Sequence, residues 1–509
     1  MIRETRIKSG RLRGMPAADP RVSVFRGIPY AQPPVNELRF RAPVPVQPWD
    51  GVLDCREFGT IPMQDIPGGD PEEFYAKEWH VDPKISMGED CLNLNVWTPA
   101  KTQEEKLPVF VWIFGGGFQC GYSSEMEFDG ERLARRGIVV VSMNYRVNIF
   151  GLLAHEDLSA ETPDGPNTNF GMLDQMAAMQ WVRENIAAFG GYADNITIGG
   201  QSAGAGSVLN HIASPMTEGL FHKAIMQSGG GLRTKVFVPL KNKMDAEQLG
   251  KEFFEFAGIR SLEEARALSA GELFEAYVKF RDIHGYVCFQ PCVDGHFLVE
   301  DPSQAIINGH HKNIPYLLGH TSGEQFGIPA TLQDFSDLIR RQYPDCCDEI
   351  LNVTKDFTTE QMQDLFRGDV FNVRQLANIL FCRVQVMQNR HSPFLYYFAP
   401  DSIPGDNAGA FHSSDLWFTF ETLAKCSRPF HGKHYDLARK MCNYWTNFVK
   451  SGNPNGDDTD GEPMPEWVPF SNASPNCLQL NENEISMQTA ESALAKIMYC
   501  KHLQIKEGE

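Results

Sequence analysis

The sequence contains no run of 18 consecutive apolar residues, and its opening segment, MIRETRIKSGRLRG, is charged but lacks the apolar core of a secretion signal. Positive charge is also scarce. The chain has 46 Lys and Arg residues against 65 Asp and Glu residues, which gives a formal net charge of −19. Such a charge opposes broad attraction to nucleic acid or to anionic membranes. We therefore expect a soluble, cytoplasmic protein that acts on a small molecule, with no nucleic-acid or membrane partner.

Patterns typical of metal and cofactor sites are missing as well. The twelve cysteines form no C-x-x-C pair, and the adjacent Cys346 and Cys347 are poorly placed to chelate one tetrahedral metal ion. His310 and His311 are also adjacent, and neighbouring side chains in a turn diverge. A phosphate-binding loop would need Gly-Lys-Ser/Thr, which is absent, and no Rossmann G-x-G-x-x-G stands in a suitable place. We expect free buried thiols, no metal and no cofactor.

The composition and the order of apolar segments predict an α/β protein. Hydrophobic residues make up 42% and charged residues 22% of the chain, values that suit a globular enzyme with a sizeable core. Residues 109–114 and 137–145 are continuous apolar runs, as in strands that are covered on both faces. Residues 169–191 then have apolar side chains at helical spacing and end in two glycines. This alternation predicts a central, mostly parallel, twisted sheet flanked by helices.

Two long segments interrupt this alternation, at about 239–282 and about 330–389. Both are rich in Leu, Phe, Glu, Gln and Arg at helical spacing, so we interpret them as helical insertions over the active-site edge of the sheet. A chain of 509 residues could hold two or three domains. The sequence has no internal repeat, low-complexity tract or separating linker, however, and we predict that residues 1–509 form a single domain.

The stretch ITIGGQSAGAGSVLN contains a G-x-S-x-G motif centred on Ser202, between a β-branched run and a helix-like run. A serine hydroxyl is a weak nucleophile, so an enzyme that uses it must expose it, activate it with a base and stabilise the resulting oxyanion. Gly200 and Gly204 leave room for a sharp turn that exposes the serine. The helix that follows directs its free N–H groups to the same place, which makes Ala203 N–H an oxyanion donor. A plain glycine-rich turn is the alternative.

A second cluster of small residues, IFGGGFQCG, follows the apolar run VFVW. Gly115, Gly116 and Gly117 lack side chains, so their backbone can approach a substrate oxygen closely. This loop therefore supplies further candidate donors for an oxyanion.

Several stretches together resemble the type-B carboxylesterase family, which includes cholinesterases, bacterial para-nitrobenzyl esterases and some fungal lipases. The resemblance runs in the family's order from about Phe25 to Trp467, and it is closest in character to the bacterial para-nitrobenzyl esterases. It implies an α/β-hydrolase fold with a Ser-His-Glu triad. The stretches that carry it are FRGIPYAQPPVNELRF, GEDCLNLNVWTP, VWIFGGGF, VVVSMNYRVNIFG, MLDQMAAMQWVRENIAAFGG, GQSAG and YWTNFVKSGNPNG.

The resemblance assigns roles to individual residues. Ser202 matches the nucleophile, and Gly116, Gly117 and Ala203 match the oxyanion donors. The stretch GHTSGEQF places Glu324 at the position of the acid, although Gln325 stands where glycine is usual.

The stretch GAFHSSDLWFTF places His412 at the position of the base. The order Ser202, Glu324, His412 is that of α/β-hydrolases. Asp294 is the alternative acid, although the Asp-Gly pair in CVDG is also typical of a turn. The other histidines after Glu324 are His391, His431, His434 and His502.

Three further residues are candidates for lining the site. Gln201 stands where many relatives have glutamate, which removes a negative charge beside Ser202 and makes selection of cationic choline esters less expected. Phe114 replaces a His or Tyr before the three glycines. Ser228, in MQSGG, either borders the site through hydrogen bonds or simply ends a strand.

Other family positions concern structure. Arg39 and Glu89 match a structural ion pair. Cys91 matches half of a disulfide found in secreted relatives, but Pro62 stands in place of its partner, so we expect no bridge, in agreement with a reducing compartment.

The function implied is that of a serine carboxylester hydrolase for esters with short to medium acyl groups. In HGYVCFQPCVDG, Gly285 and Val287 are small where cholinesterases have large aromatic residues, which suggests room for more than acetyl. A specialised esterase for acetyl or aromatic acyl groups on sugars or natural products is the alternative. A non-catalytic binding protein of the same fold is less expected. The sequence does not indicate the oligomeric state.

Overall fold

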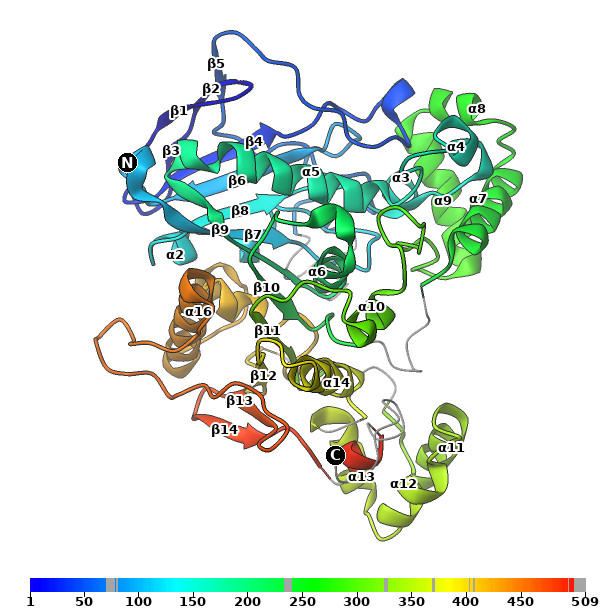
Figure 1. The fold of residues 1–509 in the computed structure, drawn as a ribbon, viewed down its shortest axis with the longest axis vertical. Coiled ribbons are helices and arrows are strands. Elements are labelled where there is room, and N and C mark those ends of the chain that lie inside the picture. The colour runs from blue at the N-terminus through cyan, green and yellow to red at the C-terminus, as the bar shows by residue number, and fades with distance from the viewer. Residues whose placement is uncertain are drawn as a thin grey trace.

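A computed structural model gives the fold of the protein (Figure 1). It describes residues 1–69, 78, 81–232, 240–324, 328–368, 371–401, 403–405, 408–492 and 494–498. Pro239, at the start of the first expected insertion, Gln325 and His502 lie outside the described residues.

The centre of the fold is one large mixed sheet. Its strands lie in the order β14-β13-β12-β11-β10-β9-β7-β8-β6-β4-β3. Every pairing from β8 across to β13 is parallel, and the pairings outside this block are antiparallel. The expected mostly parallel sheet is therefore confirmed in its central part. The strands are β3 (Met15–Pro16), β4 (Ser23–Pro29), β6 (Asn93–Thr98), β7 (Leu107–Ile113), β8 (Val139–Met143), β9 (Gly191–Gln201), β10 (Lys223–Gln227), β11 (Tyr316–Thr321), β12 (Phe394–Phe398), β13 (Asn476–Leu480) and β14 (Ile485–Thr489).

The apolar runs of the sequence form the middle of this sheet. All residues of β8 and β10 are buried, as are the last five of β7. Parallel strands need crossover connections, which helices provide, so both faces are covered and β-branched residues are favoured throughout. This explains why VFVWI and VVVSM have no polar and apolar alternation.

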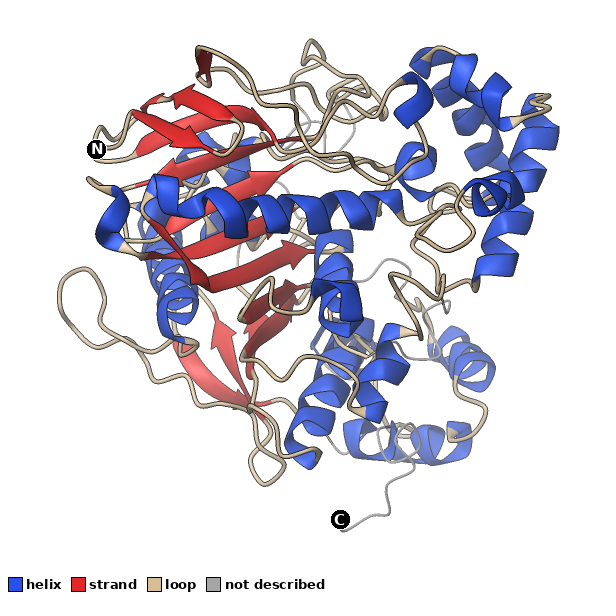
Figure 2. Ribbon diagram, turned by 45° about the horizontal axis from the view of Figure 1, so that its top comes forward, coloured by secondary structure: helices blue, strands red, loops and turns tan. Residues whose placement is uncertain are grey.

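Helices flank the sheet. Helix α5 (Phe170–Asn185) crosses the face of the sheet that is turned to the viewer in Figure 2. Helix α6 (Ala203–Ala213) packs on β9 and β10, and α14 (Val373–Met387) packs on β11. Helix α16 (Gly432–Ser451) contacts β7 and β9, together with α2 (Glu131–Ala134) and α15 (Leu416–Thr419). The connections therefore take the form expected of an α/β protein.

Both segments interpreted as insertions contain helices. Figure 1 shows α7 to α9 together at the upper right and α11 to α13 at the lower right. These helices are α7 (Lys243–Ala257), α8 (Leu262–Ala267), α9 (Ala270–His284), α11 (Leu332–Gln342), α12 (Cys347–Val353) and α13 (Thr359–Gly368).

The smaller elements lie around the sheet. Strands β1 (Glu4–Ile7), β2 (Gly10–Arg13) and β5 (Val52–Asp54) form a separate three-stranded sheet near the N-terminus. Helices α3 (Asn148–Leu152), α4 (Glu156–Glu161) and α10 (Pro302–Asn308) complete the α-helices that the described residues form.

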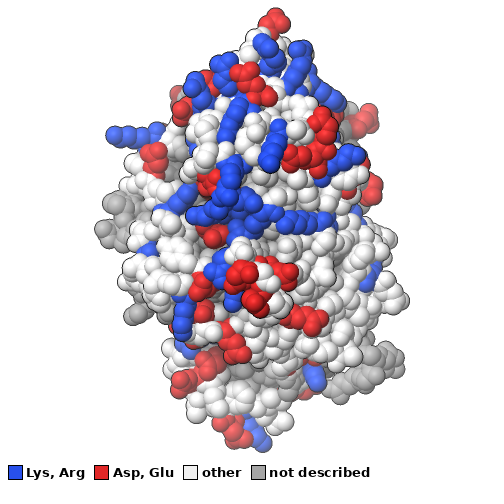
Figure 3. Space-filling model, turned by 90° about the vertical axis from the view of Figure 1, so that its left-hand side faces the viewer, with Lys and Arg blue, Asp and Glu red and all other residues white. Residues whose placement is uncertain are grey.

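The surface carries mixed charge. Figure 3 shows Lys and Arg side chains in a band across one face, with Asp and Glu side chains among them. Exposed ion pairs near the N-terminus include Arg13 with Glu4, at 2.7 Å, and Lys8 with Glu184, at 3.0 Å. Within the described part of the chain, no helix has the length and apolar character needed to cross a membrane.

The Arg39–Glu89 ion pair expected from the sequence is present and buried. Arg39 donates to both carboxylate oxygens of Glu89, at 2.7 and 2.6 Å, and its remaining nitrogen donates to backbone carbonyls that include Leu268 O at 2.7 Å. Cys91 is a free thiol, like the other cysteines that the structure describes.

Candidate active site

Ser202 lies in the sharp turn between β9 and α6. Its backbone has φ 55° and ψ −122°, a conformation that residues other than glycine rarely adopt. The two motif glycines are required by close packing. A Cβ on Gly200 would lie 2.4 Å from the Gly204 carbonyl carbon, and a Cβ on Gly204 would lie 2.1 Å from Ile113 O. The strand and helix can therefore meet at Ser202 only if both positions lack a side chain.

Three side chains that are far apart in the sequence form a continuous hydrogen-bonded series. Ser202 Oγ lies 2.8 Å from His412 Nε2, and His412 Nδ1 lies 2.5 Å from Glu324 Oε2. Because an ionised carboxylate only accepts, Nδ1 of the ring carries the proton and Nε2 is free to accept from the serine hydroxyl. In this arrangement the imidazole can take a proton from Ser202.

Glu324 is held in its ionised form at the end of β11. Its other oxygen accepts from Thr321 N at 2.9 Å and from Thr321 Oγ1 at 3.2 Å. Burial by itself would raise the pKa of Glu324, but the charge and hydrogen bond of His412, together with Arg374 and Ser228, lower it to about 2. A buried carboxylate with this environment can stabilise a positive charge on the imidazole.

The loops that carry Glu324 and His412 are joined directly. Gly323 N donates to Ala410 O at 2.8 Å, and Gly323 pairs with Phe411 in an isolated parallel bridge. A Cβ on Gly323 would lie 2.6 Å from Ala410 O, so the approach depends on glycine. This contact brings His412 over the ends of the parallel strands, where the ligands of α/β proteins usually bind.

The three-glycine loop lies against the serine. A Cβ on Gly115 would be 3.1 Å from Ser202 Cβ, and Gly116 and Gly117 have φ values of 102° and 64°. No described residue accepts a hydrogen bond from the backbone N–H groups of Gly116, Gly117 or Ala203. These three groups are therefore available to a negatively charged oxygen beside Ser202.

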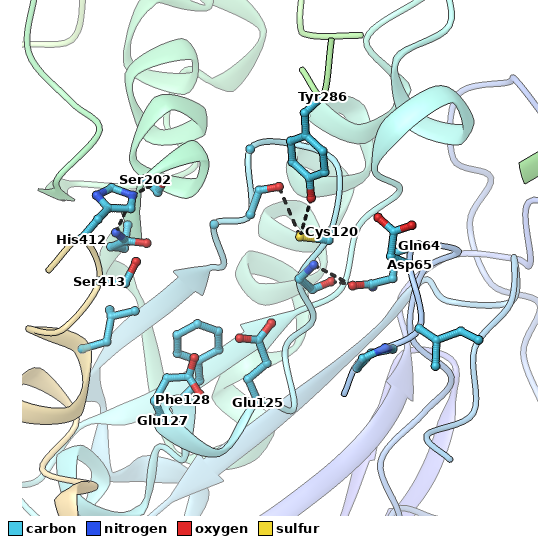
Figure 4. Close-up of a pocket in the computed structure, with 18 of the residues that line it drawn as sticks. Gln64, Asp65, Cys120, Glu125, Glu127, Phe128, Ser202, Tyr286, His412 and Ser413 are labelled. Atoms are coloured by element: carbon cyan, nitrogen blue, oxygen red, sulfur yellow. Dashed lines mark hydrogen bonds between the residues drawn. The ribbon is translucent and has the colours of Figure 1, made fainter. Parts of the chain in front are cut away.

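A cavity of about 580 Å³ opens beside the serine, large enough for a small-molecule ligand. Figure 4 shows Ser202 and His412 on one side of it, Cys120 and Tyr286 across from them, and Glu125 and Glu127 along the bottom of the view. The lining residues are Gln64, Asp65, Ile66, Pro67, Gly69, Gly115, Gly116, Gly117, Cys120, Gly121, Glu125, Glu127, Phe128, Gln201, Ser202, Tyr286, His412, Ser413 and Leu416.

The three candidate lining residues have different positions. Gln201 lines the cavity, and its Nε2 lies 3.2 Å from His412 Nε2. Phe114 and Ser228 do not belong to the described lining. Phe114 is fully buried and stacks on Tyr145 with the ring centres 4.2 Å apart. Ser228 is buried beside Glu324, and its hydroxyl helps to lower the pKa of that carboxyl group.

Asp294, the alternative acid, and two of the other histidines make contacts elsewhere. Asp294 accepts from the backbone N–H groups of His296 and Leu298, at 3.2 and 2.9 Å, as a turn residue does. His431 and His434 contact each other at the start of α16, with ring centres 4.4 Å apart.

The paired histidines diverge as expected. His310 contacts Glu300 and His311 contacts Gln385. Among the described residues, no group of three or more His, Cys, Asp or Glu side chains is arranged to hold a metal ion.

The cavity also contains residues from other segments, which no sequence motif indicated. Glu125 and Glu127 follow the three-glycine loop, and their spacing gave no sign that both carboxyl groups would be buried in the site. Cys120 and Tyr286 contact each other, with the Tyr286 hydroxyl 3.4 Å from Cys120 Sγ. The acidic stretch SSEMEFDG directly after a candidate oxyanion loop was the available signal for the first pair.

Comparison with known proteins places the chain in a family. The sequence profile of the carboxylesterase family matches residues 2–496. Para-nitrobenzyl esterase of Bacillus subtilis (strain 168) is 35% identical over 453 residues, which cover 85% of this chain and 87% of that protein. Cholinesterase of Mus musculus is 32% identical over 510 residues, which cover 93% of this chain and 82% of that protein.

Solved structures agree. A PNB esterase has a TM-score of 0.79 and 27% identity, over 97% of this chain and 99% of that chain. A carboxylesterase of Geobacillus stearothermophilus has a TM-score of 0.78 and 30% identity, over 98% of this chain and 99% of that chain. The chain therefore belongs to the carboxylesterase family, has the α/β-hydrolase fold, and is a carboxylic ester hydrolase.

Proposed function

We propose that the protein hydrolyses carboxylic esters of small molecules through an acyl-enzyme, with Ser202 as nucleophile, His412 as general base and acid, and Glu324 as the partner of the imidazole. The observation that carries this proposal is the series Ser202 Oγ, His412 Nε2, His412 Nδ1 and Glu324 Oε2, with separations of 2.8 and 2.5 Å. No cofactor is needed, because the three side chains supply the nucleophile and the proton transfers.

The first half of the reaction forms the acyl-enzyme. His412 Nε2 takes the proton of Ser202 as its Oγ attacks the ester carbonyl carbon, and Glu324 stabilises the imidazolium. The N–H groups of Gly116, Gly117 and Ala203 donate to the oxyanion of the tetrahedral intermediate. His412 then gives its proton to the departing alkoxide oxygen, and the alcohol leaves.

The second half releases the acid. A water molecule loses a proton to His412 as its oxygen attacks the acyl carbon, and the oxyanion again lies against the backbone N–H groups. Collapse of this intermediate breaks the bond to Ser202 Oγ, which regains the proton from His412. The carboxylic acid departs and the enzyme is restored.

The cavity also bears on substrate size. A volume of about 580 Å³ suits esters with short to medium acyl groups and a small alcohol.

We further infer that the chain folds as a single domain, since helices α7 to α9 and α11 to α13 lie within segments that leave and rejoin the elements of one sheet. The free thiols favour a reducing, cytoplasmic location.

The test is labelling of the whole protein with a fluorophosphonate probe, followed by hydrolysis of para-nitrophenyl acetate. Wild-type protein should be labelled at Ser202, and the Ser202→Ala variant should lose labelling and at least about 10³-fold in kcat. Ser336→Ala, at a partly exposed serine on α11, is the matched control and should retain both. Full activity in Ser202→Ala would place the chemistry elsewhere.

A further inference from the structure

The loop that carries the proposed oxyanion donors has an unusual backbone. Three successive residues have positive φ, namely Gly116 at 102°, Gly117 at 64° and Phe118 at 64°. Glycine adopts such values readily, but phenylalanine adopts them only at a cost in free energy. A strained segment of this kind keeps its shape only where its surroundings hold it. The next residue, Gln119, makes hydrogen bonds that do so.

The backbone N–H of Gln119 fixes the first peptide unit of this loop. It donates to Gly116 O at 2.9 Å, and Cys120 N donates to the same oxygen at 3.2 Å. The carbonyl and the N–H of a trans peptide unit point in opposite directions. Since the Gly116 carbonyl turns toward Gln119, the N–H of Gly117 in the same unit turns away and stays available to an oxyanion.

The side chain of Gln119 fixes the second peptide unit. Its Nε2 donates to Gly117 O at 3.1 Å and to Phe289 O at 2.7 Å. Both partners are carbonyl oxygens, which only accept, so the amide nitrogen must face them. The amide oxygen in turn accepts from the hydroxyl of Tyr277 on α9. These three contacts together favour a single orientation of the amide.

Burial makes these hydrogen bonds costly to lose. Gln119 is 2% exposed, and Tyr277 is fully buried. The bond to Phe289 O is buried as well, and a buried carbonyl without a donor costs free energy. Gln119 does not belong to the described lining of the cavity, so it can act on the reaction only through the loop.

The same amide joins the loop to the segment that the family resemblance places beside the acyl group. Phe289 belongs to this segment, HGYVCFQPCVDG. A Cβ on Gly117 would lie 3.4 Å from Val287 Cγ1 and 3.6 Å from Tyr286 Cε1, so the loop and the segment also pack against each other. The side chain of Gln119 therefore holds the loop in a fixed position against a neighbouring wall.

We propose that Gln119 is a positioning residue for the oxyanion site. Its side-chain amide holds the carbonyl of Gly117, which limits rotation of the Gly117 backbone and keeps its N–H directed at the oxygen of the tetrahedral intermediate. This inference rests on the proposed function, since it concerns the oxyanion of the same reaction. Loss of the amide should slow the reaction and leave binding of the unreacted ester nearly unchanged.

The experiment uses the full-length variant Gln119→Met, which keeps the length of the side chain and removes its donors. For para-nitrophenyl acetate we expect kcat to fall by roughly tenfold to a hundredfold, with KM within about threefold of wild type, because an oxyanion donor is displaced. Gln385→Met is the matched control. Gln385 is fully buried on α14, contacts His311 and lies outside the described cavity lining, so kcat should stay within about twofold.

Two ketones separate the oxyanion site from the rest of the cavity. The ketone 1,1,1-trifluorooctan-2-one forms a bond between its carbonyl carbon and Ser202 Oγ, the serine proton passes to His412, and the carbonyl oxygen becomes an oxyanion. Octan-2-one binds without this addition, so the trifluoro ketone should bind wild type at least about 10²-fold more tightly. In Gln119→Met, the Ki of the trifluoro ketone should rise by about the factor by which kcat/KM falls, and the Ki of octan-2-one should stay within about twofold.

A second variant, Tyr277→Phe, decides the question if Gln119→Met does not fold. It keeps the ring and removes only the hydroxyl that donates to the amide oxygen of Gln119. We expect the same pattern at a smaller size, with kcat and the affinity for the trifluoro ketone both lower by about three- to tenfold and the affinity for octan-2-one unchanged.

An unchanged kcat in Gln119→Met, or in Tyr277→Phe where only that variant folds, would overturn the positioning role. Equal weakening of both ketones would also overturn it, because a general loosening of the cavity would then explain the loss of activity. Failure of the proposed function is distinct from these results. In that case wild type would not discriminate between the two ketones, and Ser202 would not react with the fluorophosphonate.

Discussion

Gln201 and Ser202 both direct a polar atom at the same nitrogen of His412. Gln201 Nε2 lies 3.2 Å from His412 Nε2, and Ser202 Oγ lies 2.8 Å from it. The amide of Gln201 can donate to this nitrogen without adding charge. The proton-accepting position of the imidazole is therefore bordered by a neutral group, whereas Glu324 at Nδ1 supplies the negative charge.

Replacing that neutral amide by a carboxylate should shift the pH profile. In Gln201→Glu, the new negative charge next to Nε2 stabilises the imidazolium, which is the inactive form of the base. We expect the acid limb of kcat/KM for para-nitrophenyl acetate to move about one unit to higher pH. Gln201→Met, which removes the amide without adding charge, should move the acid limb by a much smaller amount. If the acid limb had the same midpoint pH in Gln201→Glu and Gln201→Met, a negative charge at position 201 would have no effect on the imidazole of His412.

The low pKa of Glu324 links the site to stability. Its pKa is lowered from 4.5 to about 2 in the folded protein, so the folded state favours the ionised form. The resulting stabilisation is complete above about pH 4.5 and is lost as the pH falls towards 2. It amounts to on the order of 3 kcal/mol. Denaturant unfolding at several pH values should therefore show a steeper loss of stability in wild type than in Glu324→Gln over this range.

The same variant should lose most of its activity at neutral pH. A glutamine cannot stabilise the imidazolium and favours the wrong tautomer of His412, so we expect kcat to fall by about 10³ to 10⁴. If the free energy of unfolding changed with pH by the same slope in wild type and in Glu324→Gln, the lowered pKa of Glu324 would be contradicted, whatever the activity of the variant.

A feature of this site could be predicted from the sequence when the residues that form it lie close together in the chain. The turn at Ser202 is defined by residues next to one another, since Gly200 and Gly204 must lack side chains for β9 and α6 to meet. Such a motif can be recognised from spacing alone. The pairing of Glu324 with His412 depends on a contact between two distant loops, and the family resemblance supplied it where spacing could not.

Burial of single side chains was the part that the sequence did not reveal. Phe114 precedes the three glycines of the proposed oxyanion loop, yet its ring turns into the core against Tyr145. Glu127 is acidic and would ordinarily be expected in solvent, yet it is buried in the cavity wall. Both outcomes depend on packing between segments that are remote in the chain, which no local pattern encodes.

The proposed oxyanion loop should tolerate no side chain at Gly116. This residue has φ 102°, and a Cβ would lie 2.2 Å from the carbonyl oxygen of Cys120. Gly116→Ala must therefore displace the loop and its N–H group, and loss of one oxyanion donor costs about 10² to 10³ in kcat. Gly271→Ala on α9, where a Cβ meets nothing within 4 Å, should leave kcat within about twofold of wild type. Equal kcat values in both variants would exclude Gly116 from the oxyanion site.

The length of the acyl group that the enzyme accepts should be limited by Val287, which lies near Gly117, the second glycine of the proposed oxyanion loop. Val287 lies outside the described cavity lining, but its Cγ1 would be 3.4 Å from a Cβ on Gly117, so a larger side chain at this position would approach a proposed oxyanion donor. Val287→Phe should therefore lower the ratio of kcat/KM for para-nitrophenyl butyrate to that for the acetate by roughly tenfold, because the longer acyl chain loses its space. Val299→Phe, the same substitution at another exposed valine, is the control and should not change the ratio. An unchanged ratio in Val287→Phe would place the acyl chain elsewhere in the cavity. A steep fall from acetate to butyrate in the wild-type protein would contradict the expectation that Gly285 and Val287 leave room for more than acetyl.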